Sequence, residues 1–369
     1  MQRVSLHPCL LPPRPIAAKK PPLKPGALFA QHGRLHRAKH IVDHQEHSSY
    51  LLTLGEHLGW SFTGSPGTES WLNRMARILN FREGEEGGLV HVNFRRRSSS
   101  LNLLISRILR RDSARAGPLF GKRDISAEGW TMRDFGLIRI WSHSEVPNLI
   151  CELSPWRSDS REMVMIWYAL QVIYPGIVQG GGLPLHAALV SRGGMGVLLA
   201  GAEGAGKSTC CRRIAEEWTV LADDGVLIVP VNGPSYAAHP LPTWSELIMG
   251  RSERTCTVEH GVPLSAIFFL EKASQDEVVP LGQGHASVMI NASASYVARQ
   301  GWKKPDPGQD RCLKTTIFDN SCRIAKTVPS FLLRVNPSGE FWKPMERALH
   351  RSSPSLHGVL EVANLSQHG

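Results

Sequence analysis

The chain has 369 residues, of which 42% are hydrophobic and 20% charged, and its formal net charge is +10. This length suffices for two domains, or for one large core with a smaller annex. No run of 18 or more apolar residues occurs, which argues against a membrane-spanning helix. The seven cysteines form neither a CxxC pair nor a zinc-binding spacing, so we expect reduced thiols and a cytoplasmic location.

Residues 1–47 have the composition of a disordered, basic, Pro-rich leader. They carry eight Lys or Arg residues against Asp43 and Glu46, a net charge of +6. No continuous apolar stretch in them matches the core of a signal peptide. Such a segment either attracts polyanions weakly or is simply solvated. Four histidines in this segment recur at helical spacing: His36, His40, His44 and His47. This spacing would suit a metal site, but no second ligand cluster accompanies them.

Residues 48–165 predict a small N-terminal α+β domain. Its expected elements are two strands around a turn, an amphipathic helix and two further strands, in residues 48–64, 69–80, 135–143 and 148–154. The helix has Trp71, Met75 and Ile78 at helical spacing. Residues 95–111 combine six arginines with an apolar helical pattern. They fit either a basic docking surface for an acidic peptide or the exposed face beside a packed helix.

Residues 166–345 predict a second domain built around a glycine-rich loop. An apolar helix that ends in three glycines leads into it, over residues 161–182. The expected order is then strand, turn, strand, loop, helix, strand, turn and strand, with the strands at 183–190, 197–201, 219–223 and 226–230 and the helix at 207–218. A loop, a strand and a terminal helix complete the domain, and residues 346–369 are expected to form a loose tail.

The loop from Gly201 to Ser208 fits the pattern GxxxxGK[ST] at every fixed position. Glycines let backbone N–H groups wrap phosphates without Cβ clashes, and the helix that follows points its positive end at the same charge. Lys207 would neutralise the β- and γ-oxygens and Ser208 would ligate Mg²⁺. The predicted nucleotide-binding residues are Gly201, Gly204, Ala205, Gly206, Lys207, Ser208 and Thr209.

Two adjacent acids, Asp223 and Asp224, come soon after the loop helix, and Gly225 follows them. Asp-Gly between two apolar runs is a hairpin signal, so we expect both acids at the tip of an antiparallel hairpin beside the loop. One carboxylate would support Mg²⁺, and its neighbour would accept the proton of an incoming hydroxyl. A turn chosen only for its propensity is the alternative.

His186 lies on the predicted strand that precedes the loop strand, and the turn SRGGMG is expected to fold these two strands into a hairpin. Because the two strands would lie side by side, the imidazole would reach the phosphates or orient the base. A purely structural histidine is the alternative.

The combination LHAALV, GVLLAGAEGAGKST and VLADDGVLIV resembles the catalytic core of HPr kinase/phosphorylase. The resemblance implies an α/β fold with a phosphoenolpyruvate carboxykinase-like P-loop core, a mixed sheet and β-hairpins. It also implies ATP and Mg²⁺ as cofactors, His186 near the transferred phosphoryl group and a homo-oligomer. Asp223 and Asp224 would share the metal and base roles, with Ser208 and Asp224 as the expected Mg²⁺ ligands. Glu246 would either supply a further carboxylate on the Mg²⁺ side or be an exposed helix residue. SELIMGRSERT departs from the later Arg-Gly-rich signature of that family.

YLLTLGEHLGWSFTG, AAHPLPTWSEL and VPLSAIFFLEK resemble the SynChlorMet cassette protein ScmC family. Such cassettes pair this protein with radical SAM enzymes and a PqqD-like carrier, so the resemblance implies a precursor peptide or small protein as substrate.

We therefore expect an ATP-dependent kinase that acts on a Ser or Thr hydroxyl. Two alternatives stay open: a nucleotide-gated module that binds and delivers a peptide, and an ATPase with little kinase activity. The chain lacks basic motifs interleaved with aromatic residues, which argues against nucleic acid as a partner.

Overall fold

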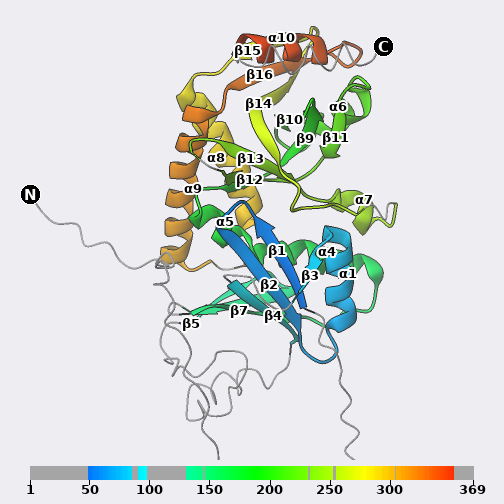
Figure 1. Ribbon diagram of the computed structural model, residues 1–369, viewed down its shortest axis with the longest axis vertical. Helices are drawn as coiled ribbons and strands as arrows, with labels where there is room; N and C mark the ends of the chain where they lie inside the picture. The colour runs from blue at the N-terminus through cyan, green and yellow to red at the C-terminus, as the bar shows by residue number, and fades with distance from the viewer. Residues whose placement is uncertain are drawn as a thin grey trace, which may run out of the picture. The chain divides into compact units, whose positions relative to one another are not determined.

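The computed structural model describes residues 49–84, 90–97, 130–143, 146–231, 233–251, 255–303 and 305–352. The described residues all belong to one compact unit. Two mixed sheets and several helices make up the described part, which confirms the predicted mixed α/β class (Figure 1). The basic leader, its histidines and most of the segment 95–111 lie outside the described residues.

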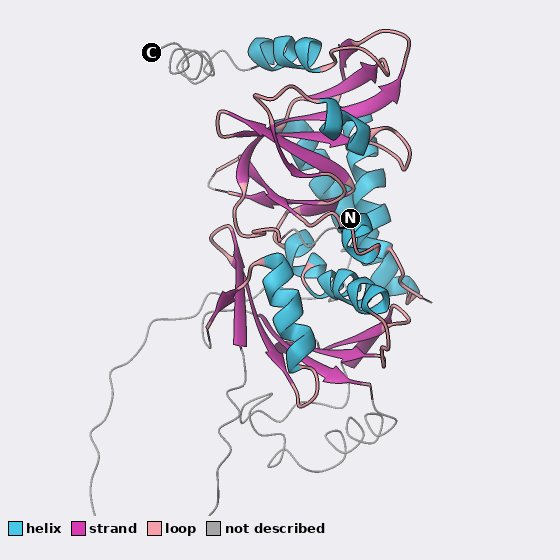
Figure 2. Cartoon of the chain, turned by 90° about the vertical axis from the view of Figure 1, so that its right-hand side faces the viewer, coloured by secondary structure: helices cyan, strands magenta, loops and turns pink. Residues whose placement is uncertain are grey.

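A seven-stranded mixed sheet is built from the first part of the chain (Figure 2). Its order is β3-β1-β2-β4-β7-β6-β5. Its strands are β1 Ser49–Leu54, β2 Leu58–Gly64, β3 Arg82–Glu83, β4 Val90–Arg96, β5 Trp130–Asp134, β6 Ile138–His143 and β7 Val146–Leu153. The strands predicted in residues 48–64 form the β1–β2 hairpin as expected, and those in 135–143 and 148–154 pair as β6 and β7.

Helix α1 (Glu69–Leu79) covers this sheet with its apolar face, as its periodicity predicts. Trp71 and Met75 are fully buried, and Ile78 is nearly so. The Trp71 ring packs 4.9 Å from that of Phe94 on β4. The helix ends at Asn80, whose left-handed backbone (φ 51°) is a common way to terminate a helix.

The helix predicted over residues 161–182 is a helical run in three pieces: α4 (Asp159–Ala169), a 3₁₀ turn η1 (Leu170–Val172) and α5 (Tyr174–Gln179). Gly181, with φ 88°, lies in the glycine break that follows. A Cβ on Gly182 would lie 2.3 Å from the Ile228 carbonyl oxygen, so only glycine lets the chain pass this close to β12.

The second sheet has nine strands, and its main path runs β11-β9-β10-β14-β13-β12-β8. Its strands are β8 Leu183–Leu185, β9 Ala187–Arg192, β10 Met195–Ala200, β11 Thr219–Ala222, β12 Val226–Pro230, β13 Tyr236–Pro240, β14 Val262–Lys272, β15 Glu277–Pro280 and β16 Ser330–Val335. The predicted hairpin through SRGGMG is confirmed, since β9 pairs antiparallel with β10. β10 pairs parallel with β14, and β14 pairs parallel with β16.

The central strands of this sheet are buried on both faces. On β10, Val197 and Leu199 enter one hydrophobic cluster, whereas Leu198 and Ala200 enter the other. This period-2 alternation explains why such strands are continuous apolar runs in the sequence.

β12 divides its side chains between two cores. Val226 and Ile228 belong to the core of the nine-stranded sheet, whereas Leu227 and Val229 belong to the core of the seven-stranded sheet. β12 is a strand of the nine-stranded sheet, but its side chains pack into the hydrophobic cores of both sheets. Part of the core of the seven-stranded sheet is therefore supplied by residues that follow the glycine-rich loop.

Five further helices follow in the described part of the chain. They are α6 Lys207–Arg213, α7 Trp244–Ile248, α8 Gln283–Arg299, α9 Pro307–Thr327 and α10 Trp342–Ser352. α8 and α9 lie side by side (Figure 1). α6 ends at Arg213, earlier than the helix predicted over residues 207–218.

The C-terminal segment departs from expectation at two points. α9 begins at Pro307, inside the stretch predicted to be a loop. The side chain of Asp306 accepts from the N–H groups of Gly308 and Gln309, both at 3.0 Å, and caps it. α10 reaches Ser352 and buries Met345 and Leu349, so the predicted tail boundary at residue 346 falls inside a helix.

The expected hairpin at Asp223–Gly225 is wrong. β11 pairs with β9, and β12 pairs with β8 and β13, so the strands on either side of the acids do not pair with each other. Ala222 lies opposite Leu189, and Val226 lies opposite Leu185, in unchanged register. The acids therefore interrupt one long strand, because the Asp-Gly signal is local whereas the pairing partner is a distant segment.

No helix in the described residues is both long and apolar enough to cross a membrane. Six cysteines in these residues are free: Cys151, Cys210, Cys211, Cys256, Cys312 and Cys322.

Asn320 ties α9 to the glycine break before β8. Its Nδ2 donates to the carbonyl oxygens of Val178 (2.7 Å) and Gly182 (3.1 Å), and the residue is only 1% exposed. We predict that Asn320→Leu lowers the free energy of unfolding by about 2–4 kcal/mol, because two buried carbonyls lose their donor. Denaturant titration measures this loss. The exposed neighbour Asp319→Leu should stay within about 0.5 kcal/mol of the parent, and equal losses in both variants would contradict the role of Asn320.

Candidate active site

The glycine-rich loop leaves the buried end of β10 and turns into α6. Gly204 (φ 76°) and Gly206 (φ 109°) hold left-handed backbone that other residues rarely adopt. A Cβ on either would meet no atom within 4 Å, so the space beside the loop backbone is open. A Cβ on Gly201 would lie 2.8 Å from that of Ala205, so a larger residue would force the two ends of the loop apart. This backbone fits a phosphate cradle.

Lys207 lies beneath the loop and is only 6% exposed. Its Nζ donates to the carbonyl oxygens of Gly201 (2.9 Å) and Ala202 (3.1 Å). Burial lowers the pKa of Lys207, and the charge of Asp224, the largest of the opposing effects, raises it. The ammonium is thus held between the loop carbonyls and the acidic pair, where a phosphate oxygen would compete with the carbonyls.

Ser208 and Thr209 begin α6 with their side chains exposed to solvent. Ser208 is accessible to solvent, as a Mg²⁺ ligand would have to be. Mg²⁺ in nucleotide sites takes one or two protein ligands together with phosphates and waters. No group of three or more His, Cys, Asp or Glu side chains in the described residues is arranged for a metal, and such a site does not require one.

Asp223 and Asp224 have different partners. The hydroxyl of Thr243, the residue before α7, donates to Asp223 Oδ1 at 2.5 Å. Asp224 Oδ1 lies 3.3 Å from His186 Nε2. Each carboxylate is therefore oriented by a side chain from a different segment, and the two can take separate tasks.

His186 is a bend residue between β8 and β9, not part of a continuous strand as predicted. Its backbone N–H donates to Ser293 Oγ on α8 at 3.0 Å. Its ring lies 5.5 Å from that of Tyr296 on the same helix, at an interplanar angle of 31°. The bend turns the imidazole toward Asp224, and α8 fixes it from the other side.

Tyr174, the first residue of α5, is buried next to this group. Burial raises its pKa, and the charge of Asp224 raises it further. The phenol therefore stays protonated and is not a base.

The structure brings His186, Lys207, Asp223 and Asp224 together. Glu246 lies on α7, and no hydrogen bond or ion pair among the described residues joins its carboxylate to this group. Thr243, three residues earlier, donates to Asp223.

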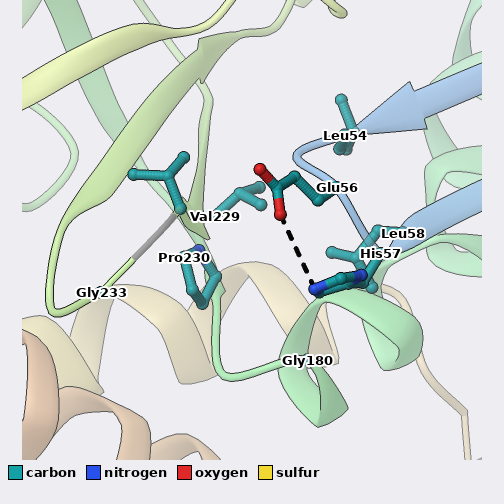
Figure 3. Close-up of a pocket in the computed structure, with 9 residues that line it drawn as sticks. Leu54, Glu56, His57, Leu58, Gly180, Val229, Pro230 and Gly233 are labelled. Atoms are coloured by element: carbon teal, nitrogen blue, oxygen red, sulfur yellow. Dashed lines mark ion pairs between the residues drawn. The ribbon is translucent and has the colours of Figure 1, made fainter.

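A separate cavity of about 220 Å³ lies between the β1–β2 turn and the end of β12 (Figure 3). It is lined by Leu54, Glu56, His57, Leu58, Gly180, Val229, Pro230, Val231 and Gly233. Glu56 Oε2 and His57 Nε2 are 3.9 Å apart, and both side chains are well exposed. The cavity is at the far end of β12 from Asp224, so it does not belong to the group around the loop.

The fold and this group define a mixed α/β protein with a GxxxxGKS loop beside an acidic pair and a histidine. The family model of the SynChlorMet cassette protein ScmC matches residues 149–350, more than half of the chain. The chain therefore belongs to the ScmC family, as its sequence resemblance indicates. No curated protein matches it.

Four residues of this group were not anticipated from the sequence: Tyr174, Thr243, Ser293 and Tyr296. Thr243 stands in the stretch AAHPLPTWSEL, and the family resemblance of this stretch was the only sequence feature that pointed to it. The other three lie on helices far from the loop in sequence, and only the fold brings them to His186 and Asp224.

Two adjacent thiols on α6 are the nucleophiles nearest to the loop in sequence. Burial raises the pKa of Cys211 to about 12, with the charge of Asp223 as a second cause, and burial raises that of Cys210 to about 11. Since the thiolate is the reactive form, we predict that iodoacetamide at pH 8 modifies both about 10²–10³-fold more slowly in the folded than in the unfolded protein. Mass spectrometry of tryptic peptides measures both rates. Equal rates in the two states would show that α6 does not protect these thiols.

Proposed function

We propose that this protein transfers the γ-phosphoryl group of ATP to a Ser or Thr hydroxyl of a peptide or small protein within a SynChlorMet cassette. Membership in the ScmC family supports the cassette role. The observation that carries the chemistry is the Asp224–His186 pair beside Lys207 of the GxxxxGKS loop. A loop that only bound a nucleotide would not need a histidine and two carboxylates at the same place.

The loop is proposed to hold the phosphates of ATP. Backbone N–H groups around Gly204 and Gly206, together with Lys207, would balance their charge. Mg²⁺, when bound, would neutralise charge on the β- and γ-oxygens, with Ser208 and one carboxylate as its protein ligands.

The two aspartates are proposed to divide the remaining work. The acceptor oxygen forms a bond to the γ-phosphorus while the bond from phosphorus to the β,γ-bridging oxygen breaks, and ADP leaves. The proton of the hydroxyl goes to Asp224, whose neighbour His186 can share it. Asp223, held by Thr243, would then be the carboxylate that holds Mg²⁺. This division departs from the sequence expectation that placed Asp224 at Mg²⁺.

The proposal is tested with the full chain, Mg²⁺, γ-labelled ATP or GTP, and candidate precursor peptides of SynChlorMet cassettes. We expect label on a Ser or Thr of the peptide. Asp224→Asn should lower the transfer rate by about 10²–10⁴-fold, the range of a general base, while the affinity for ATP changes little. Lys207→Ala should weaken ATP binding itself, because its ammonium is the cation of the loop.

Lys314→Ala is the matched control for Lys207→Ala, since Lys314 is an exposed lysine on α9 whose partner is Asp310. It should behave as the parent. Three outcomes would contradict the proposal: phosphate release that the peptide does not affect, peptide binding that needs ATP but leaves no label, and tight ATP binding with no transfer. The first indicates an ATPase and the second a nucleotide-gated delivery module.

A further inference from the structure

Helix α8 carries apolar residues on two opposite faces. One face is buried in the core of the nine-stranded sheet through Ala286, Ile290, Ala294 and Ala298. The other face, here called the outer stripe, consists of Val288, Ala292 and Tyr296 and is exposed to solvent. Val288 is 59% and Tyr296 51% exposed. Residues four apart lie above one another on a helix, so the outer stripe is one line along α8.

The outer stripe ends at the candidate active site. Tyr296 contacts the His186 ring at a centroid distance of 5.5 Å, and the imidazole in turn is 3.3 Å from Asp224. The His186 side chain is only 16% exposed, whereas Tyr296 is half exposed. The imidazole is therefore the inner group of this contact and the phenol ring the outer one.

Charge on α8 indicates the chemistry of a partner for this stripe. The helix has no Asp, Glu or Lys, and His285 and Arg299 are its only basic residues. Arg299 Nε donates to Asp310 Oδ1 at 2.7 Å, so this charge already has a partner. Between Val288 and Tyr296 the helix carries no charged side chain, and such a surface favours an apolar segment over an acidic one.

We propose that Tyr296 determines the acceptor specificity of the enzyme. It packs against an apolar or aromatic side chain that flanks the phosphorylated Ser or Thr, and Val288 and Ala292 continue the contact along the peptide. This inference rests on the proposed kinase function. Tyrosine suits the role because it offers a large, rigid apolar surface at a low cost in conformational entropy.

The kinetic test uses synthetic peptides with one Ser, each flanked by Leu, Phe, Ala, Lys or Glu. The parent should favour Leu and Phe. Tyr296→Ala should raise KM for these two about 10-fold, as for the loss of an apolar pocket contact, with little change in ATP affinity. Tyr296→Phe should behave as the parent, because the ring supplies the contact.

Phe318→Ala on α9 is the matched control, since Phe318 is a similarly exposed aromatic residue (47%). It should leave KM unchanged. Three results would overturn the inference: an unchanged peptide ranking in Tyr296→Ala, an equal loss in Phe318→Ala, or a fall in ATP affinity in Tyr296→Ala, which would place the ring at the nucleotide.

A crosslinking readout separates this inference from the proposed function. A photoreactive benzophenone amino acid replaces Tyr296 or Phe318, and the same peptides are irradiated with each variant in the presence of ATP. Capture of the Leu and Phe peptides at position 296 but not at 318 supports the inference even if the parent transfers no phosphate, in which case only the kinase proposal falls. Phosphate transfer without capture at 296 overturns the inference and leaves the kinase proposal standing.

Discussion

The candidate site depends on one interruption in an antiparallel pair of strand segments. Ala222 opposite Leu189 and Val226 opposite Leu185 keep one register across the break, after a register shift in β11 between Val220 and Ala222, and residues 186 and 223–225 leave the ladder. A backbone donor that leaves a buried ladder needs another partner, and Ser293 Oγ supplies it for His186. Because both strands are fixed on either side, the break holds the imidazole against Asp224. If these residues belonged to a flexible loop, forming the same contact would cost the conformational entropy of ordering that loop.

Strands that are buried on both faces hold the segments on either side of this break in place. β10 delivers the glycine-rich loop from between two hydrophobic clusters, and β12, which begins directly after the acids, sends alternate side chains into the cores of both sheets. A residue such as Leu227 therefore stabilises the seven-stranded sheet and fixes the start of β12 at the same time. The same residues determine the stability of the fold and the geometry of the site, so substitutions on β12 that leave a cavity would affect both.

Local signals predicted what local interactions determine. The glycine-rich loop, the β1–β2 and β9–β10 hairpins and α1 depend on turn chemistry and short-range periodicity, and each was expected at the right place. The Asp-Gly turn was misread because distant β8 and β9, not β11, supply the ladder partners. α8 has apolar residues on two opposite faces, so its sequence lacks a single amphipathic stripe. Thr243 and Tyr296 are ordinary residues in sequence, and only tertiary contacts bring them to Asp223 and His186.

The group around the glycine-rich loop has two sides with different surroundings. Lys207 and the loop are anchored on the buried strand β10, whereas Tyr296 is on the exposed face of α8, and His186 and Asp224 lie between them. Substitutions on the outer stripe of α8 change no residue that the loop packs against, because the helix is held by its opposite face. Binding of different partners can therefore vary on α8 while the geometry of Lys207 and the acids is kept.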